Sequence, residues 1–356
     1  MGEFMKHYII PVFIPHYGCI HACVFCNQQK ITGREVPVTA QEVRGIIEEH
    51  LTRITQKRHI EVAFYGGSFT ALDSKVQREL LAPAYKALQD GKIHAIRLST
   101  RPDAITKEKA EILLQFGVSI VELGVQSLDN KVLLASNRGH SSAHVVEAVA
   151  ILKDMGISCG IQLMPGLPKE DWTSLIATVK GVIELAPNFV RIYPTVIIAH
   201  TKLAAMYMDG SYKPLTLEEG VARAAFLKLL FEQAEIPIIR TGLQATADLG
   251  KREVVLAGPY HPAFGEMVDS YLFYLMLAHF AENIKKETHK APILVHHHPR
   301  DTSKLRGMAN SNIKKFQSIY NTNPLTLKAD GQKENELLIE YENSYYITNK
   351  KMLFSI

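Results

Sequence analysis

Three of the four cysteines lie close together near the N-terminus, in a pattern typical of a metal centre. Cys19, Cys23 and Cys26 have the spacing C-x3-C-x2-C and directly follow an apolar run from Tyr8 to Ile14. Cysteine thiolates hold iron-sulfur clusters. Three thiolates on a four-iron cluster leave one iron open, as catalytic metal sites keep one position open for a small molecule. The spacing therefore predicts a cluster that can bind a ligand.

A structural zinc site is the alternative use of these cysteines. Zinc takes four ligands, so His16 or His21 would have to complete a Cys3His set. The fourth cysteine, Cys159, stands in an alternating run typical of a buried strand, and alone it cannot hold a second cluster. Four cysteines in 356 residues also exclude a disulfide framework.

The composition is that of a globular chain with a sizeable core. There are 40 Lys+Arg against 36 Asp+Glu, and 47% of the residues are apolar. No stretch approaches the roughly 18 apolar residues of a membrane helix, and the N-terminus lacks the basic and apolar regions of a signal peptide. We therefore expect a cytoplasmic protein that does not associate with membranes.

Six apolar, β-branched runs recur along the first half of the chain and predict buried parallel strands. They cover residues 8–14, 60–65, 93–99, 118–125, 157–164 and 189–193. Helical patterns lie between most of them, and two of these helices end at the glycines Gly117 and Gly156. This order predicts an α/β fold, a partial (β/α)6 TIM-like barrel, with its chemistry at the C-terminal ends of the strands.

Two domains are expected. The barrel with a C-terminal helical extension, including helices over 217–234 and 267–284, would occupy residues 5–285. A small α+β domain would occupy residues 290–356, with strands over 293–297, 325–328 and 337–347 and a helix over 311–320. Residues 281–356 contain 12 basic and 8 acidic residues, so the whole formal excess of +4 lies there.

The cysteine motif after a first strand resembles the radical S-adenosylmethionine (SAM) superfamily. In that superfamily three cysteines hold a 4Fe-4S cluster, and SAM chelates the fourth iron. Electron transfer into the sulfonium then yields methionine and a 5′-deoxyadenosyl radical. The resemblance implies both cofactors, and a reductant of the flavodoxin or ferredoxin type.

Further motifs in strand order resemble the radical SAM domain of the Elongator catalytic subunit family over about residues 9–245. They are Gly-Gly-Ser-Phe-Thr from Gly66, Thr-Arg-Pro-Asp from Thr100, Gly-Val-Gln-Ser from Gly124, Asn-Arg-Gly-His from Asn137, Met-Pro-Gly-Leu-Pro from Met164 and Ile-Tyr-Pro-Thr from Ile192. Oxygen-independent coproporphyrinogen III oxidase is similar in fewer segments.

The resemblance implicates a set of SAM contacts. The matched positions are Gly67, Ser68, Gln126, Arg138 and Gln162, and Arg138 is a forked donor suited to the methionine carboxylate. Residues at the same strand ends or beside the cysteines complete the predicted cofactor contacts: Phe13, Phe25, Gly66, Ser99, Arg101 and Tyr193.

Two departures from the family pattern limit what it implies. Ser99 stands where Elongator-like chains carry Glu, so one expected contact is weakened or supplied elsewhere. The residues after 245 are too few for the acetyltransferase domain of Elongator. The resemblance therefore does not imply that this chain transfers acetyl groups.

The segment from Leu305 to Phe316 resembles the Gly-x-x-Gly loop of KH RNA-binding modules, which clamps a nucleic-acid backbone. Asn310 replaces the second glycine, and asparagine adopts left-handed conformations more readily than most residues. Nearby cations make phosphate contacts plausible: Arg300, Lys304, Arg306, Lys314 and Lys315. The alternative is an ordinary helix start on a solvated basic face.

The leading hypothesis is a radical SAM enzyme that modifies RNA, specifically a tRNA base. One alternative keeps the chemistry and replaces RNA by a small molecule or peptide. Another is a non-catalytic iron-sulfur protein that binds RNA.

Overall fold

The structure is a computed structural model that describes most of the chain. The described residues are 7–14, 22–27, 38–56, 58–244, 251, 253–284, 291–322 and 325–353. Cys19, His16 and His21 lie outside them. The chain forms two compact units: residues 1–214, 236–239 and 247–258 make the first, and residues 215–235, 240–246 and 259–356 make the second.

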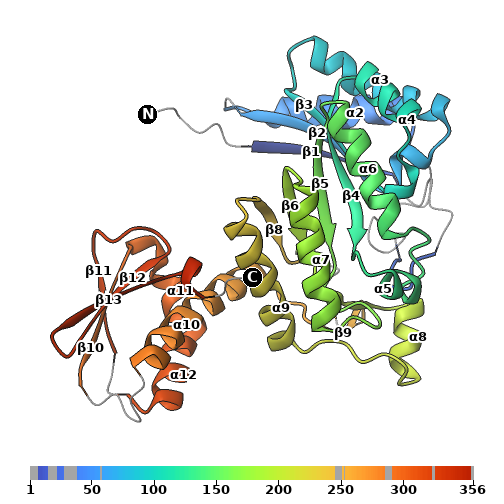
Figure 1. Ribbon diagram of the computed structural model, residues 1–356. Helices are drawn as coiled ribbons and strands as arrows, with labels where there is room; N and C mark the ends of the chain where they lie inside the picture. The colour runs from blue at the N-terminus through green and yellow to red at the C-terminus, as the bar shows by residue number, and fades with distance from the viewer. Residues whose placement is uncertain are drawn as a thin grey trace. The chain divides into compact units, whose positions relative to one another are not determined.

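A curled sheet of seven strands forms the centre of the first unit (Figure 1). Its strands, in spatial order, are β1 (His7–Ile14), β2 (His59–Gly66), β3 (Ala95–Thr100), β4 (Val118–Gln126), β5 (Ser158–Leu163), β6 (Phe189–Ile192) and β8 (Ile238–Thr241). The first six pair in parallel, which confirms the predicted open barrel. The seventh strand was not predicted, because it is short and none of its residues is fully buried.

Helices connect consecutive strands and cover one face of this sheet (Figure 1). They are α2 (Ala40–Arg53), α3 (Ser74–Gln89), α4 (Lys107–Gln115), α5 (Asn130–Ala135), α6 (Ser142–Asp154) and α7 (Trp172–Leu185). Local sequence sets their ends: the Thr39 side chain and Glu42 form a capping box before α2. Gly117 and Gly156 follow α4 and α6 with φ of +68° and +69°, as predicted from the glycine pattern.

Alternation along the strands separates an apolar face from a polar one. On β2, Val62 and Phe64 are fully buried core residues, whereas Glu61 and Tyr65 point to the opposite face. That opposite face is the interior of the half-barrel, and it carries charged groups. After β6 the chain adds β7 (Ile197–Ile198), α8 (Lys202–Met208) and β9 (Val255–Ala257), with β7 and β9 paired antiparallel.

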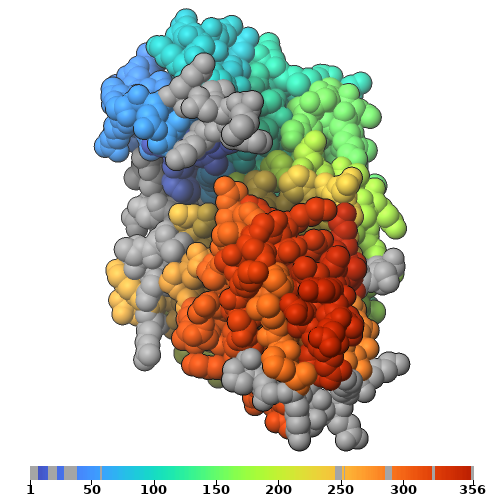
Figure 2. Space-filling view, turned by 90° about the vertical axis from the view of Figure 1, so that its left-hand side faces the viewer, coloured from blue at the N-terminus to red at the C-terminus, as the bar shows by residue number. Residues whose placement is uncertain are grey.

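The second unit combines two long helices with a four-stranded sheet. The helices α9 (Leu217–Gln233) and α10 (Phe264–Ile284) precede β10 (Ile293–His297), α11 (Thr302–Arg306), α12 (Ser311–Tyr320), β11 (Leu325–Ala329), β12 (Glu336–Tyr341) and β13 (Ser344–Asn349). The strand order is β11-β10-β12-β13, with β10 and β11 parallel. Figure 2 shows residues from β10 onward as one contiguous orange-to-red body.

The unit boundary differs from the expected one near residue 290. Phe273 and Phe280 of α10 share a buried core with Val295, Phe316 and Ile339, so α10 belongs with the C-terminal sheet. The single strand predicted over 337–347 is instead the hairpin β12–β13, because Glu342 and Asn343 turn the chain with φ of +48° and +59°. No helix among the described residues is long and apolar enough to cross a bilayer.

Candidate functional site

The described part of the cysteine segment, residues 22–27, is fastened to the first unit by backbone contacts. Val24 is buried; its amide donates to Ser136 O (3.1 Å), and its carbonyl accepts from the Leu203 amide (2.7 Å). The Asn137 side chain donates to Ala22 O (2.7 Å). Within the segment a turn brings the Cys26 amide to Cys23 O (3.1 Å). Cys23 and Cys26 are therefore held on a rigid support beside α5 and α8.

Arg138 connects this segment to the end of β4. Its Nη1 donates to Cys23 Sγ at 3.0 Å, and its Nη2 donates to Gly124 O. The guanidinium also lies over the Phe25 ring, 5.9 Å from the ring centre. Three predicted site residues, Cys23, Phe25 and Arg138, thus meet at one point. The sequence placed Arg138 near the methionine carboxylate; the hydrogen bond to a cysteine sulfur was not foreseen.

The glycine pair after β2 is required by the packing against the end of β1. Gly66 has φ of +107°, and a Cβ there would lie 2.8 Å from Ile14 O. The same Ile14 carbonyl accepts a hydrogen bond from the Gly67 amide at 2.7 Å. The pair therefore anchors the point where the chain leaves β1 toward the cysteines.

Two glutamines meet at the ends of β4 and β5. Gln162 Nε2 donates to Gln126 Oε1 at 3.4 Å. Gln126 has φ of +71° at an irregularity in the β4–β5 pairing, a strained conformation of the kind that clusters at functional sites. A Cβ on Gly124 would lie 3.1 Å from Gln126 Nε2 and 3.3 Å from Arg138 Nη2. Gln126, Gln162 and Arg138 therefore form one continuous group.

A ladder of ion pairs crosses the polar interior of the half-barrel. Arg97 Nη2 lies 2.6 Å from Glu61 Oε2, and its Nη1 lies 2.9 Å from Glu122 Oε1. Arg191 Nε lies 2.7 Å from Glu122 Oε2. All four side chains are buried or nearly so, and two positive charges balance two negative ones. We call Glu61, Arg97, Glu122 and Arg191 the interior ladder.

Two tyrosines form hydrogen bonds with Arg191 and Glu122 of the interior ladder. Arg191 Nη1 donates to Tyr193 Oη at 2.9 Å, and Tyr65 Oη donates to Glu122 Oε1 at 3.3 Å. Burial, together with the Glu122 charge, raises the pKa of Tyr65 to about 12. Tyr65 therefore stays a neutral donor at physiological pH. Tyr193 was predicted as a site residue, whereas Tyr65 was not.

The remaining predicted cofactor contacts are less closely joined. Arg101 is buried, and its Nε and Nη2 each lie 2.9 Å from the Asp103 carboxylate, so this side chain is held by its own neighbour. Ser68 is buried at the start of the loop after β2. Ser99 is half-buried opposite Glu122, and Phe13 exposes 40% of its surface.

The loop that resembles the KH motif joins α11 to α12. Ala309 and Asn310 adopt φ of +51° and +62°, so Asn310 does take the left-handed conformation expected of it. Gly307 is required too, since its φ is +69° and a Cβ would lie 2.6 Å from Ser311 Oγ.

The five cations near this loop differ in their surroundings. Arg300 pairs with Glu334 (2.8 Å), Lys304 pairs with Asp301 (2.8 Å), and Lys315 Nζ lies 4.3 Å from the Tyr274 ring centre. Each of these three therefore has a partner within the protein. Arg306 reaches only Asn310 Oδ1, at 3.5 Å, and Lys314 has no ion-pair partner among the described residues.

The interior ladder, Tyr65 and Asn137 are functional candidates that sequence reasoning did not single out. A signal existed for the ladder: Glu61, Arg97, Glu122 and Arg191 are charged residues inside otherwise apolar strands. Such residues are rarely buried unless they are paired. Asn137 stood within a recognised motif, but its role in holding Ala22 depends on a contact 115 positions away along the chain.

The donor set fits the two groups that the sequence resemblance implies. Cys23 and Cys26 supply soft sulfur ligands from one turn, at the C-terminal side of a parallel sheet. Arg138 Nε is buried and has no hydrogen-bond partner among the described residues. A third donor of this guanidinium is thus available for an anionic group such as a carboxylate.

Family models match most of the described chain. The radical SAM superfamily model matches residues 13–181, and a radical SAM C-terminal domain model matches residues 187–273. An uncharacterised protein of Methanocaldococcus jannaschii is 30% identical, over 60% of this chain and 68% of its own length.

Two curated relatives carry functional names. A tRNA uridine(34) acetyltransferase of Methanocaldococcus jannaschii is 27% identical over 74% of this chain and 55% of its own length. Elongator complex protein 3 of Saccharomyces cerevisiae is 26% identical over 58% of this chain and 45% of its own length. The chain spans about half the length of these relatives.

A solved structure shares the fold. The archaeal Elp3 of Methanocaldococcus infernus, with an N-terminal deletion, superposes with a TM-score of 0.60 at 24% identity, covering 76% of this chain and 63% of that one. Together the family matches, the relatives and the parallel half-barrel show that this chain belongs to the radical SAM superfamily of enzymes.

Proposed function

We propose that this chain uses a 4Fe-4S cluster on Cys19, Cys23 and Cys26 to cleave SAM reductively, and that it thereby modifies a tRNA base. A reductant of the flavodoxin or ferredoxin type would supply the electron. When bound, the cluster would pass this electron to the sulfonium of SAM, which yields methionine and a 5′-deoxyadenosyl radical. The chain's own residues bind, orient and shield these groups.

The observation that carries the proposal is the bond from Arg138 Nη1 to Cys23 Sγ (3.0 Å). Cysteine binds iron as the thiolate, and a guanidinium can donate a charge-assisted hydrogen bond to that sulfur. Hydrogen bonds to cysteine sulfur also tune the potential of an iron-sulfur centre. The same side chain, through Nε, is available to the carboxylate of SAM.

Residues at the strand ends would orient SAM beside the cysteines. Gln126 and Gln162 offer amide groups suited to the ribose hydroxyls, and Gly66 and Gly67 allow a close approach to the backbone after β2. The interior ladder lines the polar face of the half-barrel, where its paired charges would limit the space for free water beside SAM. A reactive radical requires such shielding.

The tRNA substrate rests on the relatives and on the second unit. The named relatives include a tRNA uridine(34) acetyltransferase. The loop from Gly307 to Asn310 has the left-handed backbone that its resemblance to KH modules requires, and Arg306 and Lys314 lie beside it with side chains available for phosphate. Lys304 is instead paired with Asp301, and Lys315 lies over the Tyr274 ring.

The test is anaerobic reconstitution with iron and sulfide, followed by dithionite, SAM and chromatography for 5′-deoxyadenosine, with and without bulk tRNA. We expect 5′-deoxyadenosine to form and tRNA to increase the rate. If 5′-deoxyadenosine forms at the same rate with and without tRNA, the result would point to a small molecule or peptide as the substrate. A fully loaded cluster that leaves SAM intact would contradict the enzymatic proposal and favour a non-catalytic iron-sulfur protein.

Two cysteine variants make the test specific. Cys23→Ala should lose iron and SAM cleavage while remaining folded. Cys159→Ala is the matched control: this thiol is fully buried, and burial raises its pKa to about 12, so it remains protonated and does not bind metal. Cys159→Ala should retain both the cluster and the activity.

A further inference from the structure

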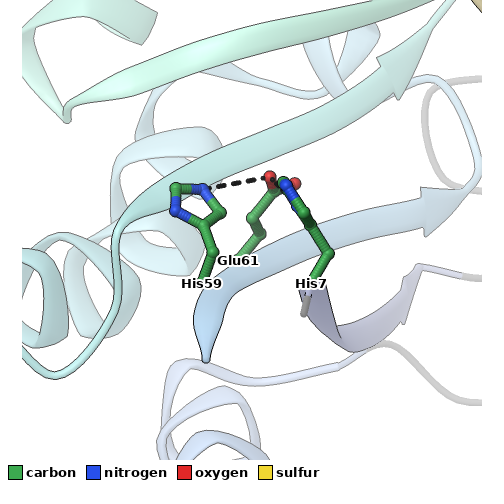
Figure 3. A group of neighbouring side chains, drawn as sticks. All are labelled: His7, His59 and Glu61. Atoms are coloured by element: carbon green, nitrogen blue, oxygen red, sulfur yellow. Dashed lines mark ion pairs between the residues drawn. The ribbon is translucent and has the colours of Figure 1, made fainter. Parts of the chain in front are cut away.

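A group of metal-binding side chains lies at the opposite end of the sheet from the cysteines. His7 begins β1, and His59 begins β2. The two are direct partners in the β1–β2 pairing, and Glu61 follows on the same face of β2. Figure 3 shows both imidazoles directed at the Glu61 carboxylate.

The distances match the spacing of ligands around one ion. His7 Nδ1 and His59 Nε2 each lie 3.3 Å from the same oxygen, Glu61 Oε1, and all three ligand atoms lie within 4.8 Å of one another. Bonds of about 2.0–2.1 Å with ordinary coordination angles place neighbouring ligand atoms roughly 3.0–3.4 Å apart. The two imidazole nitrogens lie at most 4.8 Å apart, so any adjustment needed between them is small.

The surroundings orient the carboxylate for this role. Arg97 Nη2 holds the other oxygen, Glu61 Oε2, at 2.6 Å, which leaves Oε1 directed toward the two imidazoles. Such outer partners commonly fix the orientation of metal ligands. Glu61 is buried, whereas 66% of the His7 side chain and 31% of the His59 side chain are exposed, so an ion here would keep a side open to solvent.

We propose that His7, His59 and Glu61 form a second metal site, for a divalent first-row transition ion such as Zn²⁺. Two imidazoles and one carboxylate suit such ions, whereas Mg²⁺ and Ca²⁺ prefer oxygen ligands alone. The site is separate from the cysteines, because β1 runs its full length between them, about 23 Å at the usual rise per residue. The ion fastens the start of the edge strand β1 to β2 and retains an open coordination position.

A neighbouring histidine is not part of the proposed set. His94 packs against His59 with ring centres 4.9 Å apart, but its Nδ1 accepts a hydrogen bond from the Ile60 amide (3.0 Å). Its Nε2 therefore carries the proton and cannot bind an ion in this tautomer.

The experiment titrates Zn²⁺ into the holoenzyme, whose cysteines are occupied by the cluster, and measures bound zinc and iron after gel filtration. We expect one equivalent of zinc without loss of iron, and a rise in the unfolding temperature. His7→Gln and His59→Gln should each weaken zinc binding at least about tenfold, the scale of losses at metal sites. His50→Gln, on α2 against Tyr8, is the matched control and should bind zinc normally.

A second readout does not depend on the cluster. In a variant with Cys19, Cys23 and Cys26 changed to Ala, Co²⁺ should give the visible spectrum of nitrogen and oxygen ligands, which His7→Gln should abolish. His7→Gln is chosen because the His7 side chain is 66% exposed, so its replacement removes little buried packing. Equal zinc retention by the wild type and both histidine variants, or no binding by the wild type, would overturn the proposal.

Discussion

Arg138 makes two contacts at once that depend on the planar fork of its guanidinium. Nη1 reaches Cys23 Sγ, and Nη2 reaches Gly124 O, so the side chain joins the cysteine segment to β4. A lysine would keep the charge but could not make both bonds in that geometry. The role of this residue is therefore testable by a substitution that conserves charge.

We predict that Arg138→Lys lowers the reduction potential of the reconstituted cluster and slows SAM cleavage. Loss of an N–H···S bond removes stabilisation of the more negative, reduced cluster. The shift should be tens of millivolts, since about 59 mV corresponds to 1.4 kcal/mol for one electron. A redox titration followed by electron paramagnetic resonance measures it. Arg78→Lys, on the exposed face of α3, should leave the potential unchanged; an unchanged potential in Arg138→Lys would refute the assignment.

His140 is a buried neutral histidine next to two arginines. Its Nε2 lies 3.2 Å from Val125 O, and because a carbonyl only accepts, this nitrogen carries the proton. Burial first, and then the charges of Arg138 and Arg101, lower its pKa to about 3. The unfolded chain therefore binds a proton on this residue below about pH 6.5 that the folded chain does not.

It follows that His140 makes the free energy of unfolding fall as the pH falls from about 6.5 toward 3. One such group contributes at most about 1.4 kcal/mol per pH unit. We predict that His140→Gln loses less stability than the wild type between about pH 6.5 and 4.5, measured by urea unfolding. If the free energy of unfolding falls equally with pH in His140→Gln and the wild type, the prediction is contradicted.

At the scale of elements, Gly66 fixes how the end of β2 packs against the end of β1. Gly66 accepts no side chain, because its φ is positive and a Cβ would press on Ile14 O. The helix α2 offers a contrasting glycine: a Cβ on Gly45 would have no atom within 4 Å.

We predict opposite effects of alanine at these two glycines. Gly66→Ala should destabilise the protein by about 1–3 kcal/mol, since strain and a steric clash act together. Gly45→Ala should stabilise it by about 0.5–1 kcal/mol, the usual gain in helix propensity. Urea unfolding of both variants measures the difference. If Gly66→Ala has the wild-type free energy of unfolding, β1 can shift to accommodate the added Cβ without loss of stability.

At the scale of the whole molecule, the proposed RNA binding depends on which cations are available to phosphate. The excess positive charge lies in residues 281–356, but three of the five cations near the Gly307–Asn310 loop are engaged within the protein. Net charge alone would count all five of these cations as phosphate contacts. Arg306 and Lys314 have no ion-pair partner among the described residues, so we expect these two to make the main phosphate contacts.

We predict that Arg306→Gln and Lys314→Gln each weaken tRNA binding and reduce the salt dependence of the affinity by about one unit of slope. Binding measured at several salt concentrations gives this slope. Lys86→Gln, which removes an exposed lysine paired with Asp90 on α3, should leave it unchanged. Slopes that do not differ from the wild type in either variant would place the RNA surface elsewhere.

Local patterns in the sequence were enough to predict most of the elements. Apolar β-branched runs marked six parallel strands, and Gly117 and Gly156 marked helix ends, because burial and backbone conformation act on neighbouring residues. The spacing of the cysteines is also a local pattern, and it was enough to predict the superfamily. The β12–β13 hairpin was missed because its Glu-Asn turn lacks glycine and the residues on both sides favour strands.

Only the tertiary structure decided which side chains meet. The Arg138–Cys23 bond, the interior ladder and the His7–His59–Glu61 group each join residues far apart along the chain. The distances between such residues follow from strand register and sheet curvature, which periodicity does not contain. For the same reason the sequence counted Arg300, Lys304 and Lys315 as free cations, whereas folding supplies their partners. Residue types and spacing thus determined the class of chemistry, and the packing of the sheet determined which groups are placed to perform it.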